Sequence, residues 1–145
     1  EDIDLGLRAQ LRGYKCLFVP TAIVYHVHHA TSDRISTKRF ICAQRNSIFV
    51  HLKNMPLKIL LKMMPAFLTM HILISLGYLM HTKDLKTVIT IYWQILIKSP
   101  SMLVKRRSIQ KKTKVPVSYI ESITGPFPSL TSLIIKNIKK KIFST

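Results

Sequence analysis

The chain has 145 residues, of which 23 are lysine or arginine and 6 are aspartate or glutamate, so its formal net charge is +17. Hydrophobic residues account for 48% of it, which excludes a basic disordered tail because such tails are poor in apolar residues. With 4 glycines and 7 prolines, it is neither collagen-like nor of low complexity. A chain that is both apolar and strongly basic indicates a membrane surface or a nucleic acid as partner.

The charge is unevenly distributed. Residues 1–32 balance three basic against three acidic residues, so the whole net charge comes from residues 33–145. The two cysteines are too few for a disulfide scaffold and favour a reducing compartment. The chain opens on Glu1 without the basic and apolar stretches of a signal peptide, so we expect the carboxy-terminal part of a longer protein.

The first predicted element is a short helix. Asp2 and Asp4 can accept hydrogen bonds from the free amides at a helix start, and their charge suits the dipole there. Gly13 suits the left-handed position that ends a helix. We therefore expect a helix over residues 2–12.

Two strands and a longer helix are expected next. Residues 15–19 and 22–26 are rich in β-branched and aromatic residues, which favours short strands, with Pro20 at the joint because proline cannot donate to a ladder. The apolar spacing then becomes helical over residues 36–54, and Pro56 ends that helix.

Two apolar runs follow. Residues 63–80 contain no Lys, Arg, Asp or Glu. As a helix they would extend about 27 Å, close to the ~30 Å thickness of the hydrocarbon core of a bilayer. The second run, residues 87–97, lies between Lys86 and Lys98 and is too short to span.

These lengths favour a helical hairpin within one leaflet over a single crossing. If only residues 63–80 crossed, the bases of residues 105–114 would lie across the membrane from a cytoplasmic start, which the positive-inside rule disfavours. Pro65 and Gly77 also weaken a simple spanning helix. The expected location is the cytoplasmic face of the cell membrane, with an integral arrangement as the alternative.

The carboxy-terminal part is predicted to bind anionic lipid. Residues 105–114 contain six bases, and each base near anionic lipid is worth about 1 kcal/mol. Residues 130–143 set isoleucine and leucine opposite lysine, as in a basic amphipathic helix. Nucleic acid is excluded as partner, because the basic stretch has few interleaved aromatic residues and the uncharged run at 63–80 is foreign to such proteins.

Three groups of residues could carry chemistry. Glu1, Asp2 and Asp4 place three carboxylates close together in the sequence, which suits acid–base work or the binding of a cation, although the residues taken alone favour an acidic helix cap. His26 and His28 share one face of the expected strand and could bind a metal or a phosphate, or simply be exposed histidines; His29 lies on the other face. Arg45, followed by Asn46, could reach a diphosphate or be a surface base.

The order of these motifs resembles the end of the catalytic domain of family 2 glycosyltransferases, with the nearest likeness to bacterial rhamnosyltransferase-like members. The likeness covers about residues 1–120. The motifs that carry it are Glu1-Asp2-Ile3-Asp4-Leu5, Arg8, Gly13-Tyr14, Pro20-Thr21-Ala22, Val24-Tyr25-His26, Arg45-Asn46 and Lys105-Arg106-Arg107-Ser108-Ile109-Gln110.

The resemblance implies an α/β fold of the GT-A type and inverting transfer of a sugar from a nucleotide-diphosphate sugar to a saccharide acceptor. That acceptor is expected to be lipid-linked, and the process to be cell-surface polysaccharide synthesis. The resemblance also implies Asp2 as the general base, with Glu1 beside it. His26, with His28 as rival, would serve a divalent cation (Mg²⁺ or Mn²⁺) or the diphosphate, and Arg45 a phosphate. The amino-terminal half of the family's catalytic domain, which carries the nucleotide site and a separate Asp-x-Asp metal motif, is not in these residues, so this chain alone is expected to be inactive.

The expected organisation has three parts. Residues 1–56 would end the GT-A domain, residues 57–99 would form the apolar membrane-associated hairpin, and residues 100–145 the basic amphipathic tail. The alternative function is a non-enzymatic, basic, membrane-associated helical module, which accounts for residues 33–145 but leaves residues 1–32 unexplained.

Overall fold

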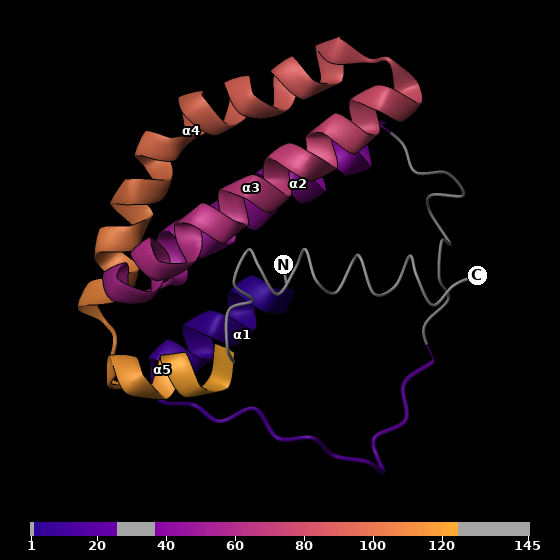
Figure 1. The fold of residues 1–145 in the computed structure, drawn as a ribbon. Coiled ribbons are helices and arrows are strands. Elements are labelled where there is room, and N and C mark those ends of the chain that lie inside the picture. The colour runs from indigo at the N-terminus through magenta and orange to yellow at the C-terminus, as the bar shows by residue number, and fades with distance from the viewer. Residues whose placement is uncertain (1, 26–36, 125–145) are drawn as a thin grey trace, which may run out of the picture.

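The computed structural model describes residues 2–25 and 37–124, which hold five α-helices (Figure 1). Within these residues there is no strand, so the predicted α/β fold of the GT-A type is wrong for this structure. Residues 15–19 and 22–25 have non-helical backbone, as a strand would need, but no described segment lies beside them to complete a ladder. A strand depends on a neighbour for its hydrogen bonds, whatever its own composition. The helices are α1 (Asp2–Leu11), α2 (Thr37–Asn54), α3 (Leu57–Thr82), α4 (Leu85–Lys111) and α5 (Val117–Thr124).

Helix α1 forms and ends as its sequence predicts. Its two aspartates lie in the first turn. At the other end Gly13 has a φ of 85°, the Gly13 amide donates to the Gln10 carbonyl at 2.9 Å, and the Tyr14 amide donates to the Ala9 carbonyl at 3.0 Å. This pair of bonds is the Schellman motif, which satisfies carbonyls that the last turn of a helix leaves open.

Helices α3 and α4 form a hairpin with a short connection, Lys83 and Asp84. Lys83 ends α3 in the left-handed conformation (φ 57°), and its amide donates to the Leu79 carbonyl. Asp84 then caps α4, because its carboxylate accepts from the Thr87 amide at 3.0 Å and from the Thr87 hydroxyl. The apolar run at 87–97 therefore lies within a much longer helix than expected, and α4 continues through Pro100 along a curved path (Figure 1).

The buried core lies where α1, α5 and the junction of α2 with α3 meet. Its fully buried side chains come from all of these elements, and Lys114 ties the start of the α5 segment to α1 through a backbone hydrogen bond to the Leu11 carbonyl at 2.8 Å. Helix α1 is thus packed firmly against the longer helices. The core residues are Leu11, Met55, Ile59, Leu60, Met63 and Ile120.

Helix α4 lies along α2 and closes the end of that helix. The Arg106 guanidinium donates from Nη1 to the Leu52 carbonyl at 2.7 Å and to the Met55 carbonyl at 2.6 Å. Gln110, one turn further on, donates to the Asn54 carbonyl at 2.8 Å. The last carbonyls of α2 have no partner within their own helix, so these side chains satisfy them from outside.

Replacing Arg106 should therefore destabilise the fold more than replacing its neighbour. Arg106→Ala leaves the two carbonyls without a donor, and we expect the free energy of unfolding to fall by about 2 kcal/mol. Arg107 is exposed, so Arg107→Ala should change it by less than ~0.5 kcal/mol. Urea unfolding followed by far-UV circular dichroism measures both, and equal losses would contradict the capping role.

Candidate functional site

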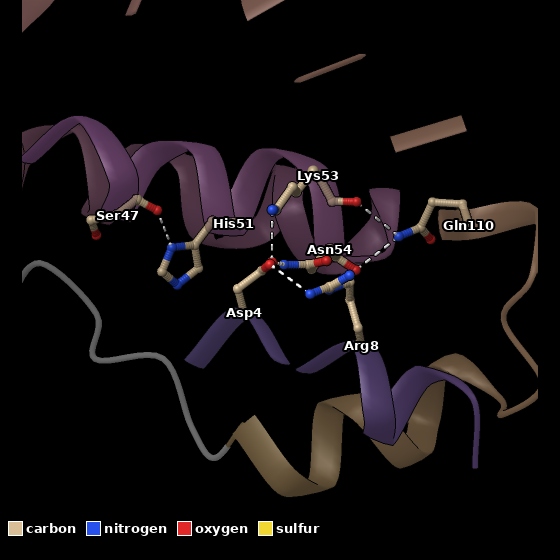
Figure 2. Close-up of polar contacts among 7 residues, drawn as sticks. All are labelled: Asp4, Arg8, Ser47, His51, Lys53, Asn54 and Gln110. Atoms are coloured by element: carbon tan, nitrogen blue, oxygen red, sulfur yellow. Dashed lines mark hydrogen bonds and ion pairs between the residues drawn. The ribbon is translucent and has the colours of Figure 1, made fainter. Parts of the chain in front are cut away.

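A polar cluster joins α1 to the end of α2 (Figure 2). Asp4 Oδ1 accepts from Asn54 Nδ2 at 2.6 Å and lies 2.9 Å from Lys53 Nζ, while Asp4 Oδ2 lies 3.3 Å from Arg8 Nη2. Lys53 and Asn54 lie in the last turn of α2, and their backbone carbonyls accept hydrogen bonds from the Gln110 side chain of α4. The Asp4 carboxylate thus joins α1 to the last turn of α2, and Gln110 joins α4 to the same turn.

The surroundings of Asp4 keep its carboxylate charged. Burial by itself raises the pKa of this carboxyl group. The hydrogen bonds from Asn54 and Lys53 and the positive charges of Lys53 and Arg8 outweigh that effect, so its pKa lies below the ordinary value of 3.8. A carboxylate held this way is a poor proton acceptor, which gives Asp4 a structural role.

Asp2 has the opposite environment. It is the first residue of α1 and is exposed, and it makes no ion pair or side-chain hydrogen bond with any described residue. The turn of α1 that follows it is fixed by Asp4. The structure therefore separates two carboxylates that the sequence presents together, one of them held in place by cations and the other open to a ligand.

Arg45 lies between α2 and α4. Its Nη1 donates to Gln94 Oε1 at 2.6 Å, its Nε donates to Asn46 Oδ1 at 3.0 Å, and its Nη2 lies 3.7 Å from Cys42 Sγ. These contacts occupy the guanidinium in packing α4 against α2. The phosphate contact expected of Arg45 is not tested by these contacts, which leave two of its five N–H donors without a described partner.

The remaining predicted site residues, Glu1, His26 and His28, lie outside the described residues. Within the part that the structure describes, no group of three or more His, Cys, Asp or Glu side chains could hold a metal ion. The described residues therefore do not provide the divalent-cation site that the resemblance implies.

An open pocket of about 380 Å³ lies beside the start of α1. Ile3, the neighbour of Asp2, forms one wall, and one face of α2 forms the other. On that face His51 Nδ1 lies 2.8 Å from the Ser47 carbonyl, which can only accept, so Nδ1 carries a hydrogen (Figure 2). Sequence reasoning missed this face, although its members recur at helical spacing: Arg39, Cys42, Ala43, Asn46, Ser47, Val50 and His51.

The outer faces of α3 and α4 are apolar and exposed. By length and composition alone, both helices are long and apolar enough to cross a membrane. On α4 the exposed residues recur at intervals of three and four and include Trp93, which is 61% exposed. Exposed apolar residues gathered on one face are typical of a surface that contacts a membrane or another protein. Its members are Leu57, Leu61, Leu68, Ile72, Leu76 and Met80 on α3, and Ile89, Trp93, Leu96, Ile97 and Val104 on α4.

Comparisons of the chain with protein-family models, with curated proteins and with solved structures find no match. The function is therefore inferred from the residues themselves.

The Asp4 cluster predicts an acid-sensitive fold. Because the pKa of Asp4 is lower in the folded than in the unfolded chain, its contribution to stability is complete well above pH 3.8 and is lost as the pH falls through the folded-state pKa. Asp4→Asn should lower the free energy of unfolding at pH 7 by about 1–2 kcal/mol and flatten its decline below pH 4. Unfolding curves between pH 7 and pH 2.5 measure this, and an unchanged acid decline in Asp4→Asn would contradict it.

Proposed function

We propose that this chain is the membrane-associated carboxy-terminal portion of an inverting glycosyltransferase, which moves a sugar from a nucleotide-diphosphate sugar to a lipid-linked saccharide in cell-surface polysaccharide synthesis. The observation that supports it is the contrast between the two carboxylates of α1: Asp4 is held by cations, and Asp2 is exposed at the helix start. This contrast fits the Glu-Asp-x-Asp order on which the resemblance depends.

In this proposal Asp2 acts as the general base. Its carboxylate accepts the proton of the acceptor hydroxyl while that oxygen attacks the anomeric carbon of the donor sugar. The nucleoside diphosphate leaves from the opposite face, which inverts the configuration. Helix α1 contributes position, because Leu11 is in the core and Asp4 is joined to α2, so Asp2 is presented from a fixed helix.

We also propose that the helices lie in one leaflet, on the cytoplasmic face. Helix α4 lies along α2, and the Arg45–Gln94 bond joins the two near the middle of the apolar part of α4. Helix α2 carries Lys38, Arg39, Arg45 and Lys53, so a crossing α4 would either draw these charges into the hydrocarbon or lose its packing on α2. An in-plane arrangement keeps α2 on the water side and the apolar faces of α3 and α4 in lipid.

The catalytic part of the proposal predicts the effect of Asp2→Asn. Asparagine preserves the shape of the side chain but cannot accept the proton, so turnover by the full-length enzyme should fall by about 10²–10⁴-fold. Binding of the nucleotide sugar and the free energy of unfolding should change little, because Asp2 is exposed. Steady-state kinetics together with titration of the nucleotide sugar measure this, and near-normal turnover would remove Asp2 from the mechanism.

The in-plane part predicts the depth of Trp93, the only tryptophan in the chain. On an in-plane α4 its ring lies within roughly 5–10 Å of the headgroup boundary. In a crossing helix that enters at Leu85, Trp93 would lie about 12 Å deep, near the centre of the ~30 Å hydrocarbon core. With anionic vesicles, fluorescence quenching should be strongest for lipids brominated near the headgroup. Strongest quenching by lipids brominated near the chain ends would contradict the in-plane arrangement.

A second function is favoured by the exposed apolar surface of α3 and α4, which involves no catalytic residue. It is a non-enzymatic module that attaches a protein to anionic lipid through that surface and through the bases of the chain. Vesicle binding by the chain, combined with normal turnover in the Asp2→Asn enzyme, would favour this function over catalysis by α1.

A further inference from the structure

A small recess lies between the end of α1 and the end of α4. Its volume is about 150 Å³, more than the ~10–15 Å³ that one water molecule requires. The residues that line it are Arg8 and Leu11 of α1, Arg12 directly after that helix, and Ser108 and Ile109 of α4. Two cationic side chains and a hydroxyl around a recess of this size are typical of a site for a small anion.

The two arginines of the recess lie close together in the chain and carry like charge. Arg8 and Arg12 are four residues apart, which makes them neighbours on one side of a helix, where like charges repel each other. Arg8 is partly compensated, because its Nη2 lies 3.3 Å from Asp4 Oδ2 (Figure 2). Arg12 is exposed and forms no ion pair with any residue that the structure describes. An anion in the recess would compensate the charge of Arg12 and relieve the repulsion.

The negative groups beside the recess already have partners. The Asp4 carboxylate accepts a hydrogen bond from Asn54 and lies 2.9 Å from Lys53 Nζ, so it does not neutralise both arginines. The last carbonyls of α1 carry the negative end of the helix dipole, but the Leu11 carbonyl accepts from the Lys114 amide at 2.8 Å. The recess therefore keeps a positive electrostatic potential.

The kind of donor indicates phosphate as the anion. Each guanidinium presents five N–H donors in a planar fork, and the Ser108 hydroxyl adds one more donor. A carboxylate has two oxygens, which a single fork can satisfy. A phosphate group presents three or more acceptor oxygens, so it can bridge two forks and a hydroxyl.

The recess lies at the end of the exposed apolar face of α4. Val104, the last residue of that face, is 66% exposed and precedes Ser108 by about one helical turn. Where an apolar face in lipid gives way to polar residues, the phosphates of the headgroups are close by, and basic recesses between helices at this level bind such headgroups. The position is therefore suited to the phosphate of a lipid as well as to a phosphate in solution.

We propose that the recess between α1 and α4 binds one phosphate group, carried by a lipid headgroup or by a soluble phosphate. Arg8 and Arg12 would each present a fork to its oxygens, and Ser108 would donate from its hydroxyl. The inference goes beyond the proposed function, because such a site binds its ligand whether or not Asp2 is catalytic.

Calorimetric titration tests the site without any measurement of activity. The 145-residue chain, in an uncharged detergent that contains no phosphate, is titrated with inorganic phosphate at a fixed ionic strength. Arg12→Ala should weaken binding by about tenfold, because hydrogen bonds from a charged donor are lost. Arg107→Ala removes the same charge from an exposed position outside the recess, and it should weaken binding by less than about twofold.

Two further titrations separate a built site from general attraction to a net charge of +17. Ser108→Ala should weaken phosphate binding by about threefold, since it removes one neutral hydrogen bond and no charge. Acetate should bind at least about tenfold more weakly than phosphate. Equal weakening by Arg12→Ala and Arg107→Ala, or acetate binding as tight as that of phosphate, would overturn the proposal. Urea unfolding of Arg12→Ala and Ser108→Ala verifies that both variants fold.

Vesicles distinguish the two sources of the phosphate group. The native chain and the two arginine variants are floated with phosphatidylcholine vesicles that contain phosphatidic acid. Given the calorimetric difference between the variants, a larger loss of vesicle binding by Arg12→Ala than by Arg107→Ala would identify the lipid headgroup as the ligand. Equal losses of vesicle binding would identify a soluble phosphate.

Discussion

The carbonyl end of α2 is the point on which the structure depends. Helix α2 ends at Asn54, and its last carbonyls have no hydrogen-bond partner within the helix. Pro56, two residues later, has no amide hydrogen to donate to them. Arg106 and Gln110 reach these carbonyls from α4, while Asp4 reaches the side chains of the same turn from α1. One helix terminus thereby fixes the position of α4 along α2 and the position of α1 beneath both.

The basic residues of the chain fall into two groups, those that make contacts between helices and those that are exposed. Arg45 and Arg106 are turned inward, where they join α4 to α2. Other bases, such as Lys105 and Arg107, are exposed beside them on α4. The strong positive charge is therefore partly structural, and a count of bases overstates the charge that is free to attract a partner.

Sequence reasoning predicted the local features of the fold well. The aspartates in the first turn of α1, the glycine after it and the proline after α2 define helix ends through contacts a few residues long, and these ends are where the sequence places them. The strands at 15–19 and 22–26 were predicted by the same local criteria, but a strand requires a distant partner, and the described residues contain none.

The candidate site shows the same limit. Glu1, Asp2 and Asp4 are alike in sequence. The spacing of Asp4 and Arg8 is that of a local ion pair, but the contacts of Asp4 with Lys53 and Asn54 come from far along the chain. Likewise, Arg106 and Arg107 are neighbours in a basic run, and nothing local indicates that the first closes α2 while the second remains exposed. Contacts between residues so far apart in the chain are not encoded in spacing or composition.

The closure of α2 by residues far along the chain has a consequence for the order of folding during synthesis. When α2 emerges from the ribosome, the residues that cap its end have not yet been synthesised, because Arg106 follows Leu52 by 54 positions. Ile120, which packs in the core with Leu11, is synthesised later still. Both apolar helices must emerge before either contact can form, so a nascent chain exposes them while it is incomplete. Early contact with a membrane would shield these helices from aggregation, and α2 and α1 would then close on a hairpin that lipid already holds.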